Sequence, residues 1–186
     1  MKKVNIFILS FLLSYSLSFS QTSWINQSVS TAYTLNDVHF VNNDNGWVVG
    51  AWGNSPNIKG VLFKTTNSGN NWVMVTNNIV MLSAVHFIDN NTGWIAGDSG
   101  KVFKSTNGGL DWTLQSSITN KYLSGVYFLN NNTGWISGYG GIIRKTTDGG
   151  NTWLVQSSGT NADLTSMCIV DNNTGWVSGT ANTLRK

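Results

Sequence analysis

The sequence predicts an all-β protein, and within that class a β-propeller. Three observations support this prediction. The composition is rich in turn-forming and aromatic residues, a unit of about 40 residues recurs four times, and each complete unit contains four short apolar runs separated by turn residues.

The composition argues against long helices. The 186 residues include 20 glycines and 9 tryptophans but no glutamate, and charged residues make up only 10%. Surface helices favour Glu, Lys, Ala and Leu, whereas aromatic residues between turn formers favour strands. An aromatic content of 12% is also enough to build a hydrophobic core, which argues against a disordered chain.

The first element is a predicted secretory signal peptide at residues 1–20. Lys2 and Lys3 precede an apolar run from Val4 to Leu17, and Ser18 and Ser20 fit the small-residue positions before a cleavage site at Gln21. The run is shorter and more polar than the ~20 apolar residues that span a bilayer. We therefore expect a secreted, periplasmic or cell-surface protein comprising residues 21–186.

Charge and cysteine usage exclude several classes of protein. Without Lys2 and Lys3 the formal net charge falls from +3 to +1, which gives no reason to expect a nucleic-acid partner. Cys168 is the only cysteine, so an internal disulfide is impossible. The predicted fold must be stabilised by packing alone.

The repeat defines four units, or blades, each with a tryptophan after a polar turn. We place them at residues 35–76, 82–117, 123–158 and 164–186, the last one incomplete. The sequence NNTGW occurs three times and NDNGW once, and these phrases end at Trp47, Trp94, Trp135 and Trp176. The first interval is six residues longer than the other two because the first unit contains an insertion at Ala51–Gly60.

The second unit shows the expected strands clearly. Its apolar runs are Ala84–Ile88, Trp94–Gly97, Lys101–Ser105 and Trp112–Gln115, each of strand length. The first run is apolar on both faces, so both faces need cover. Blades that stack on their neighbours supply that cover, whereas a sandwich or a linear solenoid is the competing architecture.

A second phrase joins the third and fourth strands of each complete unit. Its pattern is Ser/Thr-x-Asp/Asn-x-Gly-x-x-Trp. The short Asp or Asn side chain can accept backbone N–H groups of the turn, and the glycine supplies a positive φ. The residues that fit the pattern are Thr65, Asn67, Gly69, Trp72, Ser105, Asn107, Gly109, Trp112, Thr146, Asp148, Gly150 and Trp153.

The two phrases together resemble a known family. The second phrase resembles the Asp-box, or BNR-type repeat, of sialidase-like propellers. Its alternation with NNTGW resembles the photosystem II stability/assembly factor family, over Trp24–Lys186. This resemblance implies a non-catalytic binding scaffold for a protein partner such as a membrane-protein complex of photosynthesis. In an organism that does not photosynthesise, it implies a secreted interaction protein.

The length departs from that family, whose members are typically seven-bladed. Residues 23–30 (SWINQSVS) resemble an isolated fourth strand, and the chain stops after a third strand. Two interpretations follow. The chain is about four blades of a larger propeller, which we favour, or the Trp24 strand completes the last blade and closes a small four-bladed ring.

An enzymatic function is not expected. Glycoside hydrolysis generally needs two carboxylates, and the chain has no Glu and places most of its Asp residues in turns. His39, His86, Tyr127 and Cys168 occupy one repeat position, which indicates a packing slot and no metal site. We expect no cofactor and no catalytic residue. The alternative function is a sialidase- or glycosidase-like protein with its site in further blades, and carbohydrate binding has no support of its own.

Two features are candidate binding surfaces. Lys64, Lys104, Lys145 and Lys186 share one repeat position and should form a row on one rim. The family resemblance implies partner docking there, while the alternative is a set of solvated strand-end lysines. The second feature is Trp52 in the insertion, which either stands exposed for binding or folds back on the blade edge.

Overall fold

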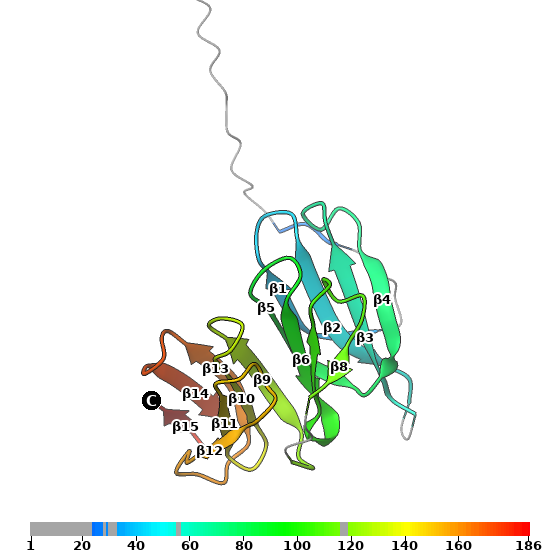
Figure 1. Ribbon diagram of the computed structural model, residues 1–186. Helices are drawn as coiled ribbons and strands as arrows, with labels where there is room; N and C mark the ends of the chain where they lie inside the picture. The colour runs from blue at the N-terminus through cyan, green and yellow to red at the C-terminus, as the bar shows by residue number, and fades with distance from the viewer. Residues whose placement is uncertain (1–23, 28, 30–32, 55–56, 116–118) are drawn as a thin grey trace, which may run out of the picture.

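The computed structural model describes residues 24–27, 29, 33–54, 57–115 and 119–186, and these residues form four consecutive antiparallel sheets. Three sheets have four strands and the last has three, each in the order of the chain. The sheets follow one another from the N-terminal to the C-terminal side of Figure 1, so the first and the fourth lie at opposite ends. The predicted propeller architecture of about four blades is confirmed.

The blades have the following strands. Blade 1 contains β1 (Thr34–Phe40), β2 (Gly46–Trp52), β3 (Lys59–Thr65) and β4 (Val73–Ile79). Blade 2 contains β5 (Leu82–Phe87), β6 (Gly93–Gly97), β7 (Val102–Ser105) and β8 (Thr113–Leu114), with a short 3₁₀ turn, η1 (Asp98–Gly100), between β6 and β7. Blade 3 contains β9 (Leu123–Phe128), β10 (Gly134–Gly138), β11 (Ile142–Thr146) and β12 (Leu154–Gln156). Blade 4 contains β13 (Leu164–Ile169), β14 (Gly175–Gly179) and β15 (Thr183–Arg185).

The NNTG phrases form the turns between the first two strands, as predicted. In blade 2, Asp89 Oδ1 accepts the backbone N–H groups of Asn91 and Thr92 at 2.7 and 2.6 Å. Asn130 does the same in blade 3 for Asn132 and Thr133. The Asx side chain thus closes the turn and fixes the register of the hairpin.

The glycine of each NNTG phrase is required by a ring that lies over it. A Cβ on Gly93 would stand 2.4 Å from the ring of Phe87, and one on Gly134 would stand 2.5 Å from Phe128. Any side chain here would push the phenyl ring away. The glycine therefore allows the ring to lie flat on the hairpin and to face the neighbouring blade.

Consecutive blades pack through their first strands and share hydrophobic cores. One cluster joins blades 1 and 2, with Trp47, Leu62, Val85 and Phe87 among its members. A second joins blades 2 and 3 and includes Trp94, Val126 and Phe128. The two-sided apolar pattern of the strands is explained by these shared cores, as the sequence predicted.

Polar side chains on the first strands tie each blade to the next. Asn36 Nδ2 donates to the carbonyl of Leu82 at 2.6 Å, and Ser124 Oγ donates to that of Leu164 at 2.6 Å. Ser83 Oγ makes the corresponding bond to Leu123. In each case the donor belongs to the earlier blade and the acceptor to the later one.

The two ends of the arc leave sheet faces uncovered within the described chain. Val85 and Val126 face the preceding blade and are 3% and 7% exposed, whereas Val38, at the same position of blade 1, is 57% exposed. The described residue pairs show no element contact between blades 1 and 4 comparable to those between consecutive blades. The four blades therefore form an open arc.

Two predicted segments need comment. Residues 1–20 lie outside the described residues, and in the part of the chain that the structure describes no helix is long and apolar enough to cross a bilayer. Of the expected extra strand at residues 23–30, Trp24–Gln27 are described and carry no strand pairing. A segment forms a strand only when it pairs with the edge of another strand. The edge of β15, to which residues 23–30 were expected to pair in a closed ring, lies at the opposite end of the arc.

Candidate functional site

Each blade pairs a lysine in or directly after its third strand with the tryptophan of its second strand. Trp47 lies opposite Lys64, Trp94 opposite Lys104 and Trp135 opposite Lys145 in the antiparallel ladders. The Nζ atoms stand 4.7–5.6 Å from the ring centroids in these three pairs and in the fourth, Lys186 over Trp176. All four predicted lysines thus make cation–π contacts.

These lysines also reach toward the next blade. Lys64 Nζ donates to the carbonyl of Gly108 at 3.2 Å, and Lys145 Nζ donates to Asn172 Oδ1 and the carbonyl of Asn172 at 2.8 and 3.3 Å. Partial burial lowers the pKa of Lys64. The lysine row therefore contributes to the cohesion of the arc, and its proposed role in docking stays a prediction.

The tryptophans of the second strands connect the blades most directly. The indole of Trp47 stacks on Phe87 of blade 2 with centroids 3.7 Å apart, and that of Trp94 stacks on Phe128 of blade 3 at 3.5 Å. Their Nε1–H groups donate to the carbonyls of Gly108 and Gly149 at 3.1 and 3.0 Å. The junctions between blades 1 and 2 and between blades 2 and 3 thus each have a buried aromatic stack with a satisfied indole N–H.

The second repeated phrase forms what we call the tryptophan turns, Thr65–Trp72, Ser105–Trp112 and Thr146–Trp153. In the third, Thr146 Oγ1 accepts the N–H of Gly150 at 2.9 Å and donates to Asp148 Oδ1 at 2.8 Å. Asp148 Oδ1 also accepts the N–H of Thr152 at 2.9 Å. Hydrogen bonds from Thr152 and Thr146 lower the pKa of Asp148 to about 2.

The other two tryptophan turns have the same hydrogen bonds, with Asn67 and Asn107 in place of the aspartate. The Ser/Thr, Asn/Asp and Gly positions of the pattern, nine of its twelve residues, thus take part in the hydrogen bonds of the three turns. The indoles of Trp112 and Trp153 then pack edge-on against Phe87 and Phe128 at 6.0 Å. These two indoles cover the outer side of the junction between blades 1 and 2 and of the junction between blades 2 and 3.

The junction between blades 3 and 4 contains an open groove. Its apolar surface comes from Trp135, Ile143, Met167 and Ile169, and its volume is about 300 Å³. Ligand pockets in proteins typically occupy about 300–1,000 Å³. The groove is therefore large enough to receive a side chain from a binding partner.

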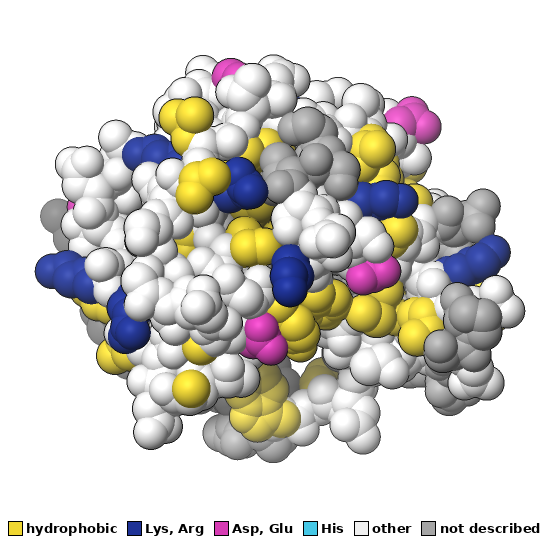
Figure 2. Space-filling model, turned by 90° about the horizontal axis from the view of Figure 1, so that it is seen from below, with side chains coloured by type: hydrophobic (Ala, Val, Ile, Leu, Met, Phe, Trp, Pro, Cys, Tyr) yellow, Lys and Arg dark blue, Asp and Glu magenta, His cyan; other side chains and the backbone are white. Residues whose placement is uncertain are grey.

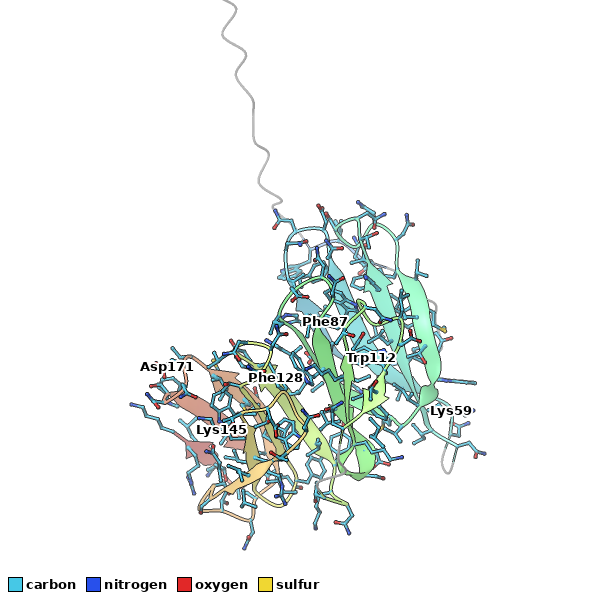
Figure 3. All side chains as sticks on the ribbon, in the orientation of Figure 1. Lys59, Phe87, Trp112, Phe128, Lys145 and Asp171 are labelled. Atoms are coloured by element: carbon cyan, nitrogen blue, oxygen red, sulfur yellow. The ribbon has the colours of Figure 1, made fainter. Side chains whose placement is uncertain are left out.

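The groove corresponds to the place that an indole fills in the other junctions. Phe87 and Trp112 lie together in Figure 3, and Phe128 is contacted by Trp153 in the same way. In blade 4, Ile169 holds the position of the two phenylalanines. No described residue of blade 4 supplies the second indole, so Ile169 faces the groove.

The rim of the groove is predominantly basic. The charged side chains that line the groove are three cations and one carboxylate: Lys145, Arg185, Lys186 and Asp171. Asp171 Oδ1 accepts the N–H of Asn173 at 2.8 Å, and this bond lowers the pKa of Asp171. The groove therefore favours an apolar side chain next to a negatively charged group. Figure 3 shows Lys145 and Asp171 on this side of the molecule.

The strand beside the groove has an unpaired edge. Among the residues that the structure describes, β15 pairs with β14 alone, whereas the equivalent strands β3, β7 and β11 each have a fourth strand on the other side. An open edge presents backbone N–H and C=O groups to an incoming extended segment. The groove and the edge thus offer a side-chain pocket and a backbone ladder side by side.

At the repeat position of His39, His86, Tyr127 and Cys168, the first three side chains form a row of rings along the first strands, and Cys168 is exposed. His86 lies between His39 and Tyr127, with ring centroids 4.4 Å apart on either side. His86 Nε2 is 2.9 Å from the carbonyl of Phe128, and burial lowers its pKa to about 4. Among the described residues no group of three metal-binding side chains occurs.

Trp52 is not at the tip of the insertion. It is the last residue of β2 and pairs with Lys59 of β3, so the insertion lengthens this hairpin. Its side chain is half-exposed, which leaves both proposed roles for Trp52 open. On the face shown in Figure 2, Lys and Arg side chains are scattered and do not gather in one patch.

The sequence did not predict the groove or the hydrogen bonds of Asn36, Ser83 and Ser124 to the next blade. The hydrogen bonds could have been inferred from the sequence, because a short polar residue follows the first leucine of every unit. The groove could have been inferred from the missing second tryptophan of the fourth unit.

The fold and the repeated junctions define a β-propeller built from tryptophan-anchored blades. The sequence profile of the family described as photosynthesis system II assembly factor YCF48 matches the chain over residues 17–115 and 65–158, and the chain belongs to this family. The family predicted from the sequence is confirmed. No curated protein matches the chain.

Among the solved structures that resemble the chain are two with the same fold. One is described as YCF48 bound to D1 peptide, with 21% identity and a TM-score of 0.66 over 83% of this chain and 49% of that chain. The other is the computationally designed Ika4 protein, with 12% identity and a TM-score of 0.63 over 89% of this chain and 97% of that chain. The chain thus spans about half the length of the YCF48 structure, and both likenesses concern the fold.

Proposed function

We propose that the chain is an exported, non-catalytic propeller that binds an extended segment of a partner protein. The observation that carries this proposal is the groove between blades 3 and 4, with its apolar residues and with Lys145 among its lining side chains. An incoming extended peptide would lie across this groove. One of its apolar side chains would enter the groove, as Trp112 and Trp153 enter the other junctions.

The partner is proposed to be a membrane protein of photosystem II. A protein of the same family and fold is described as bound to a D1 peptide. The charges of the groove support a peptide with a carboxylate near its apolar residue. Lys145 Nζ makes two hydrogen bonds within the groove, both to Asn172, so it retains the capacity to donate a third.

The binding test is a fluorescence anisotropy titration of the purified chain against a fluorescein-labelled D1 peptide. We expect saturable binding, and Lys145→Ala should weaken it about tenfold because it removes a charged donor. Lys104→Ala is the matched control, since Lys104 occupies the same position at a junction that Trp153 already fills. An absence of binding, or binding unaffected by Lys145→Ala, would refute the groove as the site.

The same titration separates the groove from the lysine row. If the row as a whole docks the partner, Lys104→Ala should weaken binding as much as Lys145→Ala does. If the groove alone binds the peptide, only Lys145→Ala should have a large effect. Equal losses would therefore move the site from the groove to the rim.

A non-catalytic role is supported by the use of the carboxylates. Asp37 Oδ2 accepts the N–H of Val85, Asp163 Oδ1 accepts the N–H of Gly140, and Asp89 and Asp171 close turns. A glycosidase needs two carboxylates facing one substrate. Incubation with a fluorogenic sialoside should therefore release no fluorophore above the rate of a buffer blank, and measurable turnover would contradict the proposal.

Export is proposed from residues 1–20 of the sequence. The chain should be cleaved before Gln21 when it is expressed with these residues in a bacterial host. N-terminal sequencing of the periplasmic fraction tests this directly. A product that retains Met1 and stays in the cytoplasm would show that the segment is not a signal peptide.

A further inference from the structure

Arg144 of β11 is a cation without a hydrogen-bond acceptor among the residues that the structure describes. The residue is half-buried, and its Nε is a buried atom that no hydrogen bond reaches. A buried N–H group without an acceptor costs free energy, and a guanidinium holds its five N–H donors in one rigid plane. Arg144 therefore retains the capacity to bind an acceptor that these residues do not supply.

The fold does not require an arginine at this position. Arg144 directly precedes the third lysine of the lysine row, and the residues that precede the first two lysines are Phe63 and Phe103. Phe63 is 3% exposed, and Phe103 packs against the core between blades 1 and 2. An apolar ring thus suffices at the same place in two other blades. The charge of Arg144 therefore points to a role other than packing.

A pocket of about 500 Å³ lies beside Arg144 in blade 3. It opens where β12 separates from β11, because the ladder between these strands ends at Gln156, opposite Ile143. Arg144 pairs with Val155 in this ladder, so both side chains lie on one face of the sheet. Val155 is 73% exposed. The pocket is therefore open to solvent, and all its lining residues belong to blade 3 and to residues 157–161, which follow it.

The lining of the pocket combines one positive charge with neutral hydrogen-bond donors. Arg144 is the single charged side chain among the lining residues. Ser157 and Thr160 contribute hydroxyls, and Gln156 contributes an amide. Thr160 Oγ1 accepts the N–H of Ala162 at 3.0 Å, so its own hydrogen is available to a ligand. A cation among hydroxyl and amide donors favours an oxyanion.

The carboxylate of Asp163 does not fill this role. Its Oδ1 accepts the N–H of Gly140, which lines the pocket, at 2.8 Å. Asp163 itself is not among the lining residues. The guanidinium of Arg144 and this carboxylate are therefore not a pair, and the place of the acceptor stays open to a ligand.

We propose that the pocket binds a small molecule that carries an oxyanion, either a carboxylate or a phosphate group, and that Arg144 holds this group. Both groups present two oxygens that match two parallel N–H groups of a guanidinium. The hydroxyls of Ser157 and Thr160 bind the remaining oxygens. Pockets for small molecules occupy about 300–1,000 Å³, so the volume admits an organic acid or a phosphate ester as well as the free ion.

The first test is the melting temperature of the purified chain in rising sodium phosphate or sodium glutarate, at ionic strength held constant with sodium chloride. We expect a saturable increase with both salts, because an anion that binds only the folded chain stabilises it. Isothermal titration calorimetry should give a dissociation constant on the order of 1 mM for each ion. Saturation with one ion should suppress binding of the other, and the ion with the lower dissociation constant identifies the preferred group.

The second test compares three variants in the same titrations. Arg144→Phe installs the residue type of blades 1 and 2, so it should fold, and it should weaken phosphate and glutarate binding about tenfold or more. Arg144→Gln retains a polar side chain and should cause a similar loss. Arg185→Gln is the matched control, because Arg185 holds the same repeat position in blade 4, outside this pocket. Circular dichroism spectra equal to that of the wild type show that the variants are folded.

The outcomes separate this inference from the proposed function. Responses to phosphate and glutarate that are equal in the wild type and in both Arg144 variants overturn the inference, as does a wild type without a saturable response. An equal loss in Arg185→Gln also overturns it, because the ions then bind in the groove. Arg144→Phe that loses phosphate binding supports the inference whatever the D1 peptide does. Lys145→Ala that weakens only peptide binding supports both sites, since Lys145 does not line this pocket.

Discussion

Replacement of Trp94 by alanine tests whether the stacked indoles stabilise the arc. Trp94 is fully buried, stacks on Phe128 at 3.5 Å and donates its Nε1–H to Gly149 at 3.0 Å. Truncation of a buried tryptophan to alanine costs about 3–5 kcal/mol, part of which is the cavity left behind. The carbonyl of Gly149 also loses its partner, at a cost of about 1 kcal/mol.

We therefore expect Trp94→Ala to lower the free energy of unfolding by about 4 kcal/mol. The assay is urea denaturation followed by circular dichroism, at equal protein concentration for every variant. With an m-value of about 2 kcal/mol/M, the midpoint should fall by about 2 M. A total stability of about 5–15 kcal/mol makes this a large fraction of the whole.

Two further variants define what would refute the reasoning. Leu154→Ala removes an exposed side chain and should change stability by less than about 0.5 kcal/mol. Trp94→Phe retains a ring but removes the donor, and it should fall between the wild type and Trp94→Ala. If Trp94→Ala costs less than about 1 kcal/mol, the indole stack does not hold blades 2 and 3 together.

Three other predictions concern single positions. Burial lowers the pKa of His86 from 6.5 to about 4 in the folded protein, so its contribution to the free energy of unfolding is fully present above pH 6.5 and is lost as the pH falls toward 4. His86→Tyr should remove most of this acid-induced loss of stability, about 3 kcal/mol, and a variant with an unchanged pH dependence would contradict the prediction. Gly134→Ala should lower the melting temperature, because its Cβ would displace Phe128, and an unchanged melting curve would refute the close contact. Thr146→Ala should lower the free energy of unfolding, measured by urea denaturation, by about 1–2 kcal/mol, because it removes the hydroxyl that bonds Asp148 and Gly150. The control Thr147→Ala, at an exposed position, should lower it by less than about 0.5 kcal/mol, and equal effects would show that the turn does not need the hydroxyl.

Most of the fold could be predicted because the turn chemistry is local. The pattern Asp89–Gly93 needs only its own backbone to form a turn, and the spacing of Trp94, Trp135 and Trp176 shows that the same unit recurs. In the second unit the expected strands differ from the observed ones by one or two residues at the ends. Strand ends depend on ladder partners, which a single run of sequence does not show.

The parts that sequence reasoning missed all involve contacts between blades. Nothing local in the sequence shows that Lys64 reaches Gly108, 44 residues away, or that Asn36 reaches Leu82. Such contacts follow from the relative placement of whole sheets.

The groove illustrates the same limit at the candidate site. The sequence identifies Lys145 and Lys186 as members of a row, but only the structure shows that they border a cavity with Trp135 and Ile169. The charge of the lysines was readable in advance. Their solvent access, which decides whether they can meet a partner, was not.

The hydrogen bonds that Asn36, Ser83 and Ser124 donate to the following blade have a consequence for how such proteins grow. Because the same contact recurs at each of these boundaries, an additional 41-residue unit inserted at a boundary would meet compatible surfaces before and behind it. Gene duplication can thus lengthen the array in whole steps without inventing a new contact.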